Sequence, residues 1–516
     1  MSRPKPEKTR QIIERLLREA EAAWGEQEYG KSIALIEQAC RKEPNEPSLY
    51  LALARAHGQR YDFPAAERCL EKAVHLSPSR AQTLGDAGHT CLEFENVELA
   101  IKFLRRAAEK NGAPIGALMT LADILIRDNL LDEAAELVSR ASQMDRQNPS
   151  VLLEQSSILR QRGNVAEAES LLRTILLKSD VAPKIRIRAL YDLASILDRS
   201  ERYDEAMIAL LEAKAVQRTQ AAPYAATLAH IQKRAKEMEQ TITAPVLERW
   251  RTEGEKLLPQ HRIALLCGHP RSGTTLLEQV LDSHHDIVSA EETKIMHDEA
   301  YLPLIKHLPE GTSVLQALDG APPSLLGHAR ENYFQCTERY IQKPIGSRLL
   351  LDKNPGLNVM IPMVVRVLPE TKIIVALRDP RDVIVSCFQQ ALPLTPISSA
   401  YLSIEGTVKQ YASVLGFWLE MRPRLGERWV QVRYEQMVED LPSVARSTLN
   451  FLGVGFDEKV LQFHEHAQKK RVKSPSHADV TRPVYRTAVG RWHNYQKYLE
   501  PYLPGLDRFL KEFNYA

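Results

Sequence analysis

The amino-acid sequence predicts two folds in one chain: an all-α repeat solenoid in the N-terminal half and an α/β domain with a mostly parallel central sheet in the C-terminal half. Small residues recur every 34 positions through most of the first 217 residues, which is typical of stacked helix pairs. From Arg262 onward, short runs of β-type residues alternate with helical stretches. That alternation favours a parallel sheet covered by helices.

Small residues mark three positions in each repeat unit. Two antiparallel helices approach closely only where the side chains at their crossing are small, so these positions predict helix pairs that pack on one another. A sixth unit, displaced by four residues, keeps the same offsets with Ala194, Ala206 and Ala213. The three series of the first five units are Ser32, Ala66, Ala100, Ala134 and Ala168; Ala39, Ala73, Ala107, Ala141 and Ile175; and Ala20, Ala54, Gly88, Ala122 and Ser156.

The period and its small positions resemble the tetratricopeptide repeat over roughly residues 14–217, in about six units. The resemblance implies a solenoid that binds a protein or peptide, either a partner or the substrate. The alternative is that the repeats only pack against the following domain or mediate self-association. Residues 218–260 lose the register but suit one or two connecting helices, and we expect the second domain over residues 261–516.

Composition excludes several other classes of protein. A chain of 516 residues is too long for one ordinary core. Its 68 basic and 66 acidic residues give a net charge of +2, which does not favour nucleic acid as a partner. Without a signal peptide or a run of 18 apolar residues, we expect no membrane span and a cytoplasmic location. The six cysteines form no C-x-x-C pair and are expected as small buried side chains.

A phosphate-binding loop opens the second domain. A predicted strand, Ile263–Cys267, runs into Gly268–Thr275, and Leu276–Asp282 then has a helical pattern. Backbone N–H groups of such a loop and of the helix start face an anion. Gly268 and Gly273 have the spacing of the nucleotide P-loop, but Thr274 stands in place of its lysine. The sequence therefore disfavours a P-loop kinase and suits a 5′-phosphosulfate ligand.

Pro270-Arg-Ser-Gly-Thr-Thr-Leu276 resembles the 5′-phosphosulfate loop of the sulfotransferases, and among them that of the tyrosylprotein sulfotransferases. Leu281-Asp-Ser-His284 and Glu291-Glu-Thr-Lys294 resemble two further segments of that family. The resemblance implies that the donor is 3′-phosphoadenosine-5′-phosphosulfate (PAPS) and that Glu292 is the catalytic base. It also implies that the 5′-phosphosulfate is held by Arg271, Ser272, Gly273, Thr274 and Thr275.

A second cofactor signature follows the predicted strand Lys372–Leu377. Arg378 and Ser386, eight residues apart, have the spacing with which sulfotransferases hold the 3′-phosphate. An arginine fork matches a phosphate bidentately. The resemblance implies four more roles: Lys353 near the transferred sulfonate, Tyr434 on the nucleotide, Arg491 near the 3′-phosphate, and Ser476 near the reacting centre.

The sequence thus predicts a PAPS-dependent sulfotransferase that moves a sulfonate group to an acceptor hydroxyl without a metal. Protein tyrosine is one candidate acceptor, and carbohydrate, lipid and small-molecule hydroxyls stay open. Tyrosylprotein sulfotransferases are membrane enzymes of the secretory pathway, and Lys294 replaces the arginine of their segment. A tetratricopeptide adaptor with an inactive transferase domain is the alternative. The pairs His284-His285 and His464/His466 lack metal-ligand spacing and are expected as surface histidines.

Overall fold

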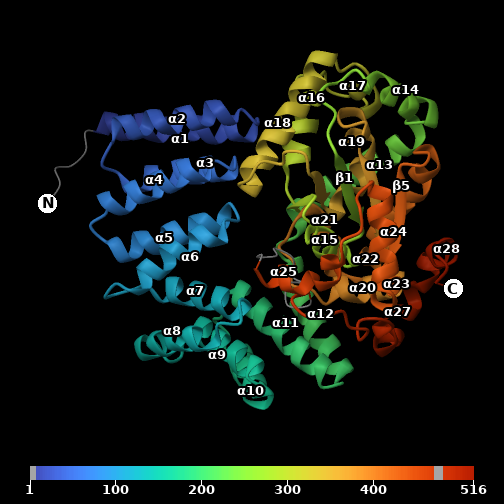
Figure 1. Cartoon of the computed structure of the whole chain (residues 1–516). Coiled ribbons are helices and arrows are strands. Elements are labelled where there is room, and N and C mark those ends of the chain that lie inside the picture. Colours follow the sequence, from blue (N-terminus) through green and yellow to red (C-terminus); the bar gives the residue numbers. More distant parts are fainter. Residues whose placement is uncertain (1–6, 470–479, 516) are drawn as a thin grey trace. The chain divides into compact units, whose positions relative to one another are not determined.

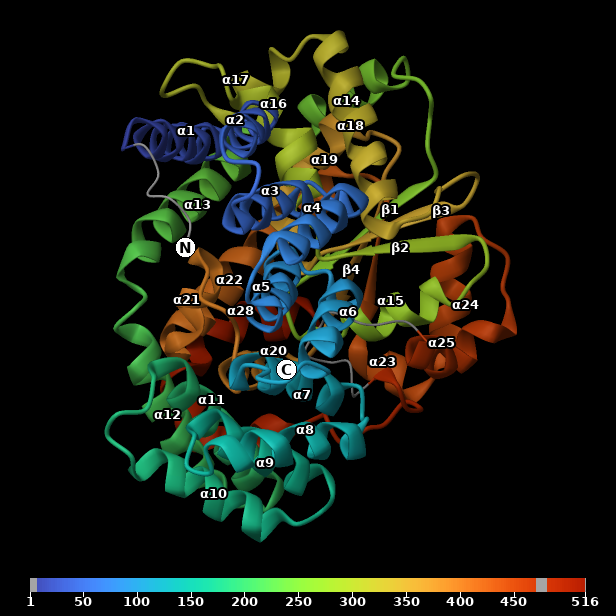
Figure 2. The ribbon, with the colours of Figure 1, turned by 90° about the vertical axis from the view of Figure 1, so that its left-hand side faces the viewer.

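A computed structural model describes residues 7–469 and 480–515 of the chain, and Figures 1 and 2 show its ribbon from two directions. Contacts divide the chain into two compact units, Met1–Asp192 and Leu193–Ala516.

The first unit is a series of antiparallel helix pairs stacked in chain order (Figure 1). The predicted all-α solenoid is therefore confirmed. An eleventh helix, α11 (Pro183–Arg199), begins in this unit and ends in the next. The ten helices before it in the described residues are α1 (Glu7–Gly25), α2 (Tyr29–Lys42), α3 (Pro47–Gln59), α4 (Phe63–Leu76), α5 (Arg80–Glu93), α6 (Val97–Ala108), α7 (Ile115–Arg127), α8 (Leu131–Met144), α9 (Pro149–Gln161) and α10 (Val165–Leu177).

The small residues of the repeat lie where the helices cross. All of the residues in the three predicted series are buried, as are the three of the sixth unit. Ser32 on α2 donates a hydrogen bond from Oγ to the carbonyl oxygen of Ala20 on α1, at 2.8 Å. A Cβ atom added to Gly88 on α5 would lie 2.5 Å from Cγ of Leu104 on α6. Close packing of the helix pairs therefore explains the 34-residue pattern.

One residue in each turn between paired helices has a left-handed backbone. These residues also repeat at intervals of 34: Gln27, Tyr61, Glu95, Asn129 and Gly163 have φ angles of 62°, 61°, 60°, 60° and 86°. Glycine and asparagine adopt this conformation easily, whereas the other three do so at a cost in free energy. The small-residue pattern gives no sign of this turn.

The second unit opens with helices and continues into a parallel sheet. Its first helices are α12 (Tyr203–Arg218), α13 (Ala222–Thr241) and α14 (Ala244–Gly254). Within the described residues, five strands pair in the order β2-β3-β1-β4-β5, and every pairing is parallel. The predicted α/β fold is thus confirmed. The strands are β1 (Ile263–Gly268), β2 (Ile287–Glu291), β3 (Leu349–Lys353), β4 (Lys372–Leu377) and β5 (Trp429–Arg433).

Helices cover both faces of the sheet. Figure 2 shows α15 (Thr274–Asp282) and α24 (Leu441–Leu452) on one side of the strands, and α18 (Pro323–Ile341) and α19 (Ile361–Val367) on the other. The core beneath α15 and α24 contains alternate residues of the strands, because successive side chains point to opposite faces. The further helices of eight or more residues in the described part are α20 (Pro380–Phe388) and α22 (Ile404–Met421).

Most of the predicted site residues lie at the carboxyl edge of this sheet. The phosphate loop follows β1, Glu292 follows β2, Lys353 ends β3, Arg378 follows β4 and Tyr434 follows β5. In parallel sheets with helices on both faces, ligands bind at this edge, where connections from neighbouring strands leave in opposite directions. The fold therefore places at one edge of the sheet residues that are widely separated in the sequence.

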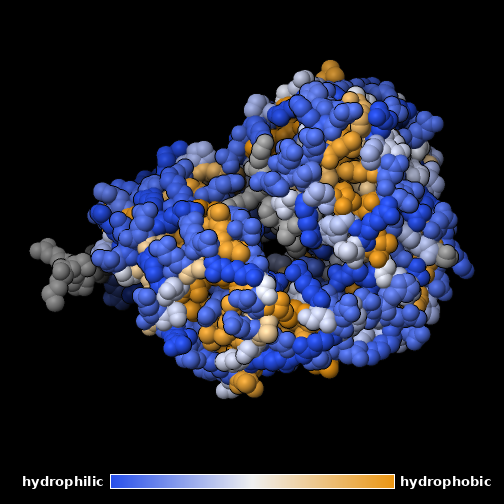
Figure 3. Space-filling model, turned by 60° about the horizontal axis from the view of Figure 1, so that its bottom comes forward, coloured by the Kyte–Doolittle hydropathy of each residue, from blue (hydrophilic) through white to orange (hydrophobic). Residues whose placement is uncertain are grey.

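One face of the molecule is mixed in polarity. On the face drawn in Figure 3, hydrophobic side chains form separate patches among hydrophilic ones. Of the six cysteines, five are buried as expected and Cys69 is half-buried. Among the described residues, no helix combines the length and the apolar content needed to cross a membrane.

Candidate functional site

The loop after β1 has the backbone of a phosphate cradle. Gly273 has a φ of 91°, and a Cβ atom there would lie 2.7 Å from Cδ2 of Tyr434. Gly268 has a φ of 143°, and its Cβ would lie 2.5 Å from the carbonyl oxygen of Ala376 on β4. Both positions therefore require glycine. Arg271 also has a left-handed backbone, with φ 72°, although it carries a side chain.

The remaining loop residues form the start of α15. Ser272 is buried, and its N–H donates to the carbonyl oxygen of His269 at 3.2 Å. Thr274 and Thr275 are the first two residues of the helix and are also buried. The unpaired N–H groups of a helix start, together with its dipole, favour an anion at this point.

Side chains from three strand ends meet beside this loop. Arg271 donates from Nε to Oγ of Ser386 on α20, at 3.0 Å. Arg378 donates from Nη1 to the carbonyl oxygen of Arg271 at 3.3 Å, and its guanidinium carbon lies 4.9 Å from the ring centroid of Tyr434. Four residues predicted for cofactor binding thus form one connected cluster with Gly273.

Arg378 is an enclosed cation of this cluster. Its side chain is 9% exposed. Nη2 donates to the carbonyl oxygen of Ala488, and Asp382 Oδ2 lies 3.7 Å away. Its Nε is buried and has no hydrogen-bond acceptor among the described residues. A buried donor without an acceptor is costly, and a bound anion would satisfy it.

Lys353 lies on the other side of β1, among three carboxylates. Its Nζ is 2.7 Å from Glu292 Oε1, 3.0 Å from Glu291 Oε1 and 3.5 Å from Glu278 Oε2. The lysine side chain has no exposed surface. Burial by itself lowers the pKa of Lys353, but the three carboxylates outweigh it and raise the pKa above its ordinary value. Lys353 is therefore charged at neutral pH.

Glu292 is the exposed member of this group. Its side chain is 41% exposed, whereas Glu291 and Glu278 are buried. Its backbone is left-handed, with φ 51°, and its N–H donates to the carbonyl oxygen of Lys353 at 2.7 Å. Lys353 also holds the carboxylate, because its Nζ donates to Glu292 Oε1. Strained backbone of this kind is common at functional sites.

The C-terminal segment is anchored to the cluster through Asp382. The N–H groups of Gly490 and Trp492 donate to the two oxygens of this buried carboxylate, at 2.8 and 2.9 Å. Arg491 therefore lies on a short piece of backbone fixed beside Arg378. Its Nη2 forms an ion pair with Asp198 of α11. The predicted site residue at position 476, Ser476, lies outside the described residues.

Sequence reasoning missed Glu278, Asp382 and Asp198. Glu278 and Asp382 lie in helices, where an acidic residue ordinarily faces solvent. Their one sequence signal is position, because Glu278 lies about one helical turn after the phosphate loop and Asp382 lies between Arg378 and Ser386. Asp198 is 293 residues away from Arg491 and carries no signal.

The prediction of surface histidines is wrong for His284. The residue is buried, and its ring nitrogens bond to the backbone of Gly455 and Asp286, at 2.9 and 3.0 Å. His285 is exposed and lies 3.3 Å from Asp457. The side chains of His284, His285 and Asp457 approach one another, but both ring nitrogens of His284 are already used.

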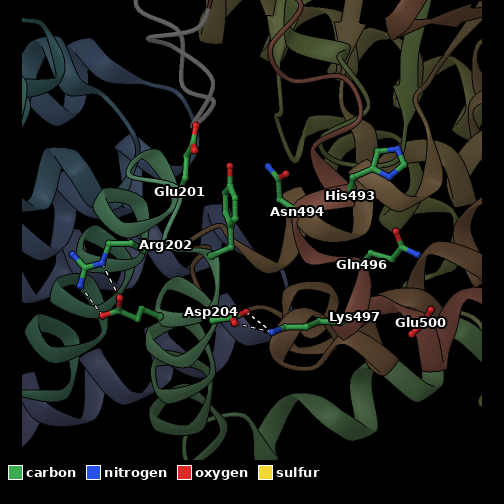
Figure 4. Close-up of a pocket in the computed structure, with 10 residues that line it drawn as sticks. Glu201, Arg202, Asp204, His493, Asn494, Gln496, Lys497 and Glu500 are labelled. Carbon is green, nitrogen blue, oxygen red and sulfur yellow. Dashed lines mark hydrogen bonds and ion pairs between the residues drawn. The ribbon is translucent and has the colours of Figure 1, made fainter.

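A separate polar cavity of about 550 Å³ lies beside the start of α12 (Figure 4). Its lining comes from residues 201–205 and from residues between 493 and 500 near the C-terminus. Asp204 and Lys497 face each other there with an N–O distance of 2.7 Å. None of the predicted site residues that the structure describes lines this cavity.

Two family models match the chain. Residues 264–458 match the sulfotransferase family. Residues 51–114, 119–183 and 153–226 match the tetratricopeptide repeat. The first match contains both phosphate-binding segments, Lys353 and Tyr434.

Curated relatives and solved structures are similar to parts of the chain. An uncharacterized protein of Aquifex aeolicus is 25% identical over 423 residues, which are 80% of this chain and 53% of the relative. A protein-tyrosine sulfotransferase of Drosophila melanogaster is 25% identical over 238 residues, 45% of this chain and 46% of the relative. The chain thus spans about half the length of these relatives. The solved structure of a mouse sulfotransferase in complex with PAP is 16% identical to this chain, with a TM-score of 0.31. The alignment covers 51% of this chain and 89% of the mouse chain.

The matched segments coincide with the two kinds of structure that the sequence predicts, a helical-repeat region and an α/β domain with a phosphate loop. The chain carries a C-terminal domain of the sulfotransferase family behind N-terminal tetratricopeptide repeats, and protein-tyrosine sulfotransferases are among its distant relatives.

Proposed function

We propose that the protein transfers a sulfonate group from PAPS to an acceptor hydroxyl. The observation that carries the proposal is the cluster of Arg271, Arg378, Ser386 and Tyr434 around the phosphate loop, with the Lys353–Glu292 pair across β1. The family match supports the same reaction class.

The loop and α15 suit the 5′-phosphosulfate. Because Gly273 has no Cβ, the loop can adopt its left-handed backbone beside Tyr434. The N–H groups at the start of α15 would bind the phosphate oxygens. Arg271 would neutralise charge on the bridging oxygen as it becomes part of the leaving phosphate. Fixed cations of this kind stabilise developing charge without reorganising during the reaction.

Arg378 and Ser386 suit the 3′-phosphate. The buried Nε of Arg378 would gain an acceptor, and the Ser386 hydroxyl would add a donor. The Tyr434 ring, which lies near Arg378, would pack against the nucleotide. These contacts would distinguish a nucleotide with a 3′-phosphate from ADP or ATP.

Glu292 and Lys353 suit the transfer step. Glu292 would take the proton of the acceptor hydroxyl, whose oxygen then forms a bond to sulfur. The bond between sulfur and the phosphate oxygen breaks, and its electron pair leaves with the nucleotide. Lys353, which pairs with Glu278 and Glu291 as well, would hold the Glu292 carboxylate and balance negative charge on the sulfonate.

The repeats would bring a protein or peptide to this reaction. Tetratricopeptide solenoids bind peptides through extended surfaces. We assign this recruiting role to residues 14–217 and the transfer reaction to residues 261–516. The similarity to protein-tyrosine sulfotransferases makes tyrosine the first acceptor to try.

The test is sulfonate transfer from radiolabelled PAPS to panels of tyrosine peptides, phenols and sugars. Labelled product with the wild type and none with Glu292→Gln is the expected result. An adaptor with an inactive domain would bind 3′,5′-adenosine bisphosphate but label no acceptor in any panel and release no bisphosphate from PAPS.

A further inference from the structure

Asp198, near the end of α11, contacts two parts of the candidate nucleotide site. Oδ2 pairs with Nη2 of Arg491. Oδ1 accepts from the hydroxyl of Tyr495 at 2.6 Å and from Nε2 of Gln389 at 3.3 Å. Gln389 follows α20, the helix that carries Ser386. Asp198 therefore links the helix of Ser386 to the turn of Arg491.

The Asp198 carboxylate is held by these protein contacts and is largely enclosed. Its side chain is 13% exposed, and Tyr495 is buried. The next helix, α12, also packs here, with the buried Lys214 ammonium 4.9 Å from the ring centroid of Phe388 on α20. The last repeat, which is formed by α11 and α12, therefore packs against α20 through Asp198 and Lys214.

Arg491 uses one nitrogen for this ion pair. Its Nη2 donates to Asp198, and the side chain is 38% exposed. The remaining donors are able to face an anion, since a guanidinium has five N–H groups in a fixed plane. The backbone on either side of Arg491 is fixed by Asp382, which also lies beside Arg378.

We propose that Asp198 is a positioning residue that presents Arg491 to the 3′-phosphate of the nucleotide, so that nucleotide affinity depends on the last repeat. This inference rests on the proposed function. It assigns to a repeat helix a part in cofactor selection that residues 261–516 alone do not supply.

The direction in which one substitution at Asp198 changes nucleotide affinity separates a positioning role from a purely electrostatic effect. A carboxylate near a phosphate repels it, so removing the charge would by itself tighten nucleotide binding. Loss of a positioning contact would instead weaken binding, because Arg491 would have to be ordered when the nucleotide binds. Asp198→Asn keeps the shape and an acceptor for Tyr495 while removing the ion pair.

The experiment is calorimetric titration of the full chain with 3′,5′-adenosine bisphosphate and with ADP. For Asp198→Asn we expect affinity for the bisphosphate to fall on the order of tenfold, as for coupled neighbours. Affinity for ADP, which has no 3′-phosphate, should not change. In an Arg491→Ala background, Asp198→Asn should have no further effect.

Asp204→Asn is the matched control, since it breaks the Asp204–Lys497 pair between the same repeat and the same C-terminal segment without touching Arg491. If Asp198→Asn does not fold, Tyr495→Phe replaces it, because this variant removes one donor to Asp198. It should also weaken bisphosphate binding. Unchanged or tighter bisphosphate binding in these variants, or an equal loss for ADP, overturns the proposal. A wild type that binds no bisphosphate overturns the proposed function itself.

Discussion

Arg271 donates a hydrogen bond from Nε to Oγ of Ser386 at 3.0 Å, across 115 residues of sequence. The bond joins the loop after β1 to the helix after β4, and these two strands are neighbours in the sheet. It therefore connects the segment suited to the 5′-phosphosulfate with the segment suited to the 3′-phosphate.

Ser386→Ala should weaken binding of 3′,5′-adenosine bisphosphate by roughly 10- to 150-fold, because one hydrogen bond to a charged group contributes about 1.5–3 kcal/mol. The substitution removes an acceptor for Arg271 and the hydroxyl that we propose as a donor to the 3′-phosphate. Ser399→Ala, on α21 (Pro396–Ser399), removes a hydroxyl that bonds only to Pro396 among the described residues and is the control. Equal affinity of the Ser386 variant and the control in calorimetry would contradict the prediction.

Gly273→Ala should destabilise the fold by about 1–3 kcal/mol and weaken nucleotide binding. Its φ of 91° disfavours a side chain, and the added Cβ would collide with Tyr434. Gly416→Ala in α22 is the control, because no atom lies within 4 Å of its Cβ and φ is not positive. That change should stabilise by about 0.5–1 kcal/mol. Urea unfolding measures the free energy of unfolding of both variants. Similar changes in that free energy for Gly273→Ala and Gly416→Ala would refute the account of the loop.

Asp352→Asn should alter the pH dependence of stability. Burial raises the pKa of Asp352 from 3.8 to about 6, with the Tyr333 hydroxyl and Lys353 acting in the opposite direction. Because the folded protein binds this proton more tightly than the unfolded chain does, Asp352 contributes to the free energy of unfolding at low pH. The contribution is fully present below pH 3.8 and is lost as pH rises through about 6. The loss amounts to about 3 kcal/mol.

The asparagine variant does not titrate at this position. Its free energy of unfolding, relative to that of the wild type, should therefore rise between about pH 4 and pH 7 by up to about 3 kcal/mol. Urea unfolding at these two pH values measures the difference. Parallel pH profiles for both proteins would show that folding does not shift the titration of Asp352.

Glu292→Gln should lower transfer by on the order of 10²–10⁴-fold while leaving nucleotide affinity unchanged. The amide keeps the size of the side chain but cannot take the acceptor's proton. Glu405→Gln, on an exposed residue that pairs with Lys409, is the control. Full turnover by the Glu292 variant would remove this residue from the mechanism.

The repeat and the main elements of the α/β domain could be predicted from the sequence. Small residues at helix crossings must be periodic because the same packing recurs, so Ala66, Ala100 and Ala134 reveal the solenoid. Strand Lys372–Leu377 has the predicted bounds because its apolar run lies between Pro369 and Pro380.

The approach of Glu278 to Lys353 could not be predicted in the same way. Glu278 belongs to an otherwise ordinary amphipathic helix, and its burial depends on a lysine from another strand. Asp198 pairs with Arg491 only after the last repeat and the C-terminal segment have folded together. Such contacts depend on tertiary structure, and periodicity or motif spacing does not encode them.

The most direct measurement is calorimetric titration of the wild type and Arg378→Ala with 3′,5′-adenosine bisphosphate, with ADP and ATP as comparison ligands and Arg508→Ala as a surface control. We expect micromolar binding that is selective for the bisphosphate and is lost in Arg378→Ala alone. No binding to the folded wild type, or equal binding of all three nucleotides, would contradict the assignment of this site to PAPS.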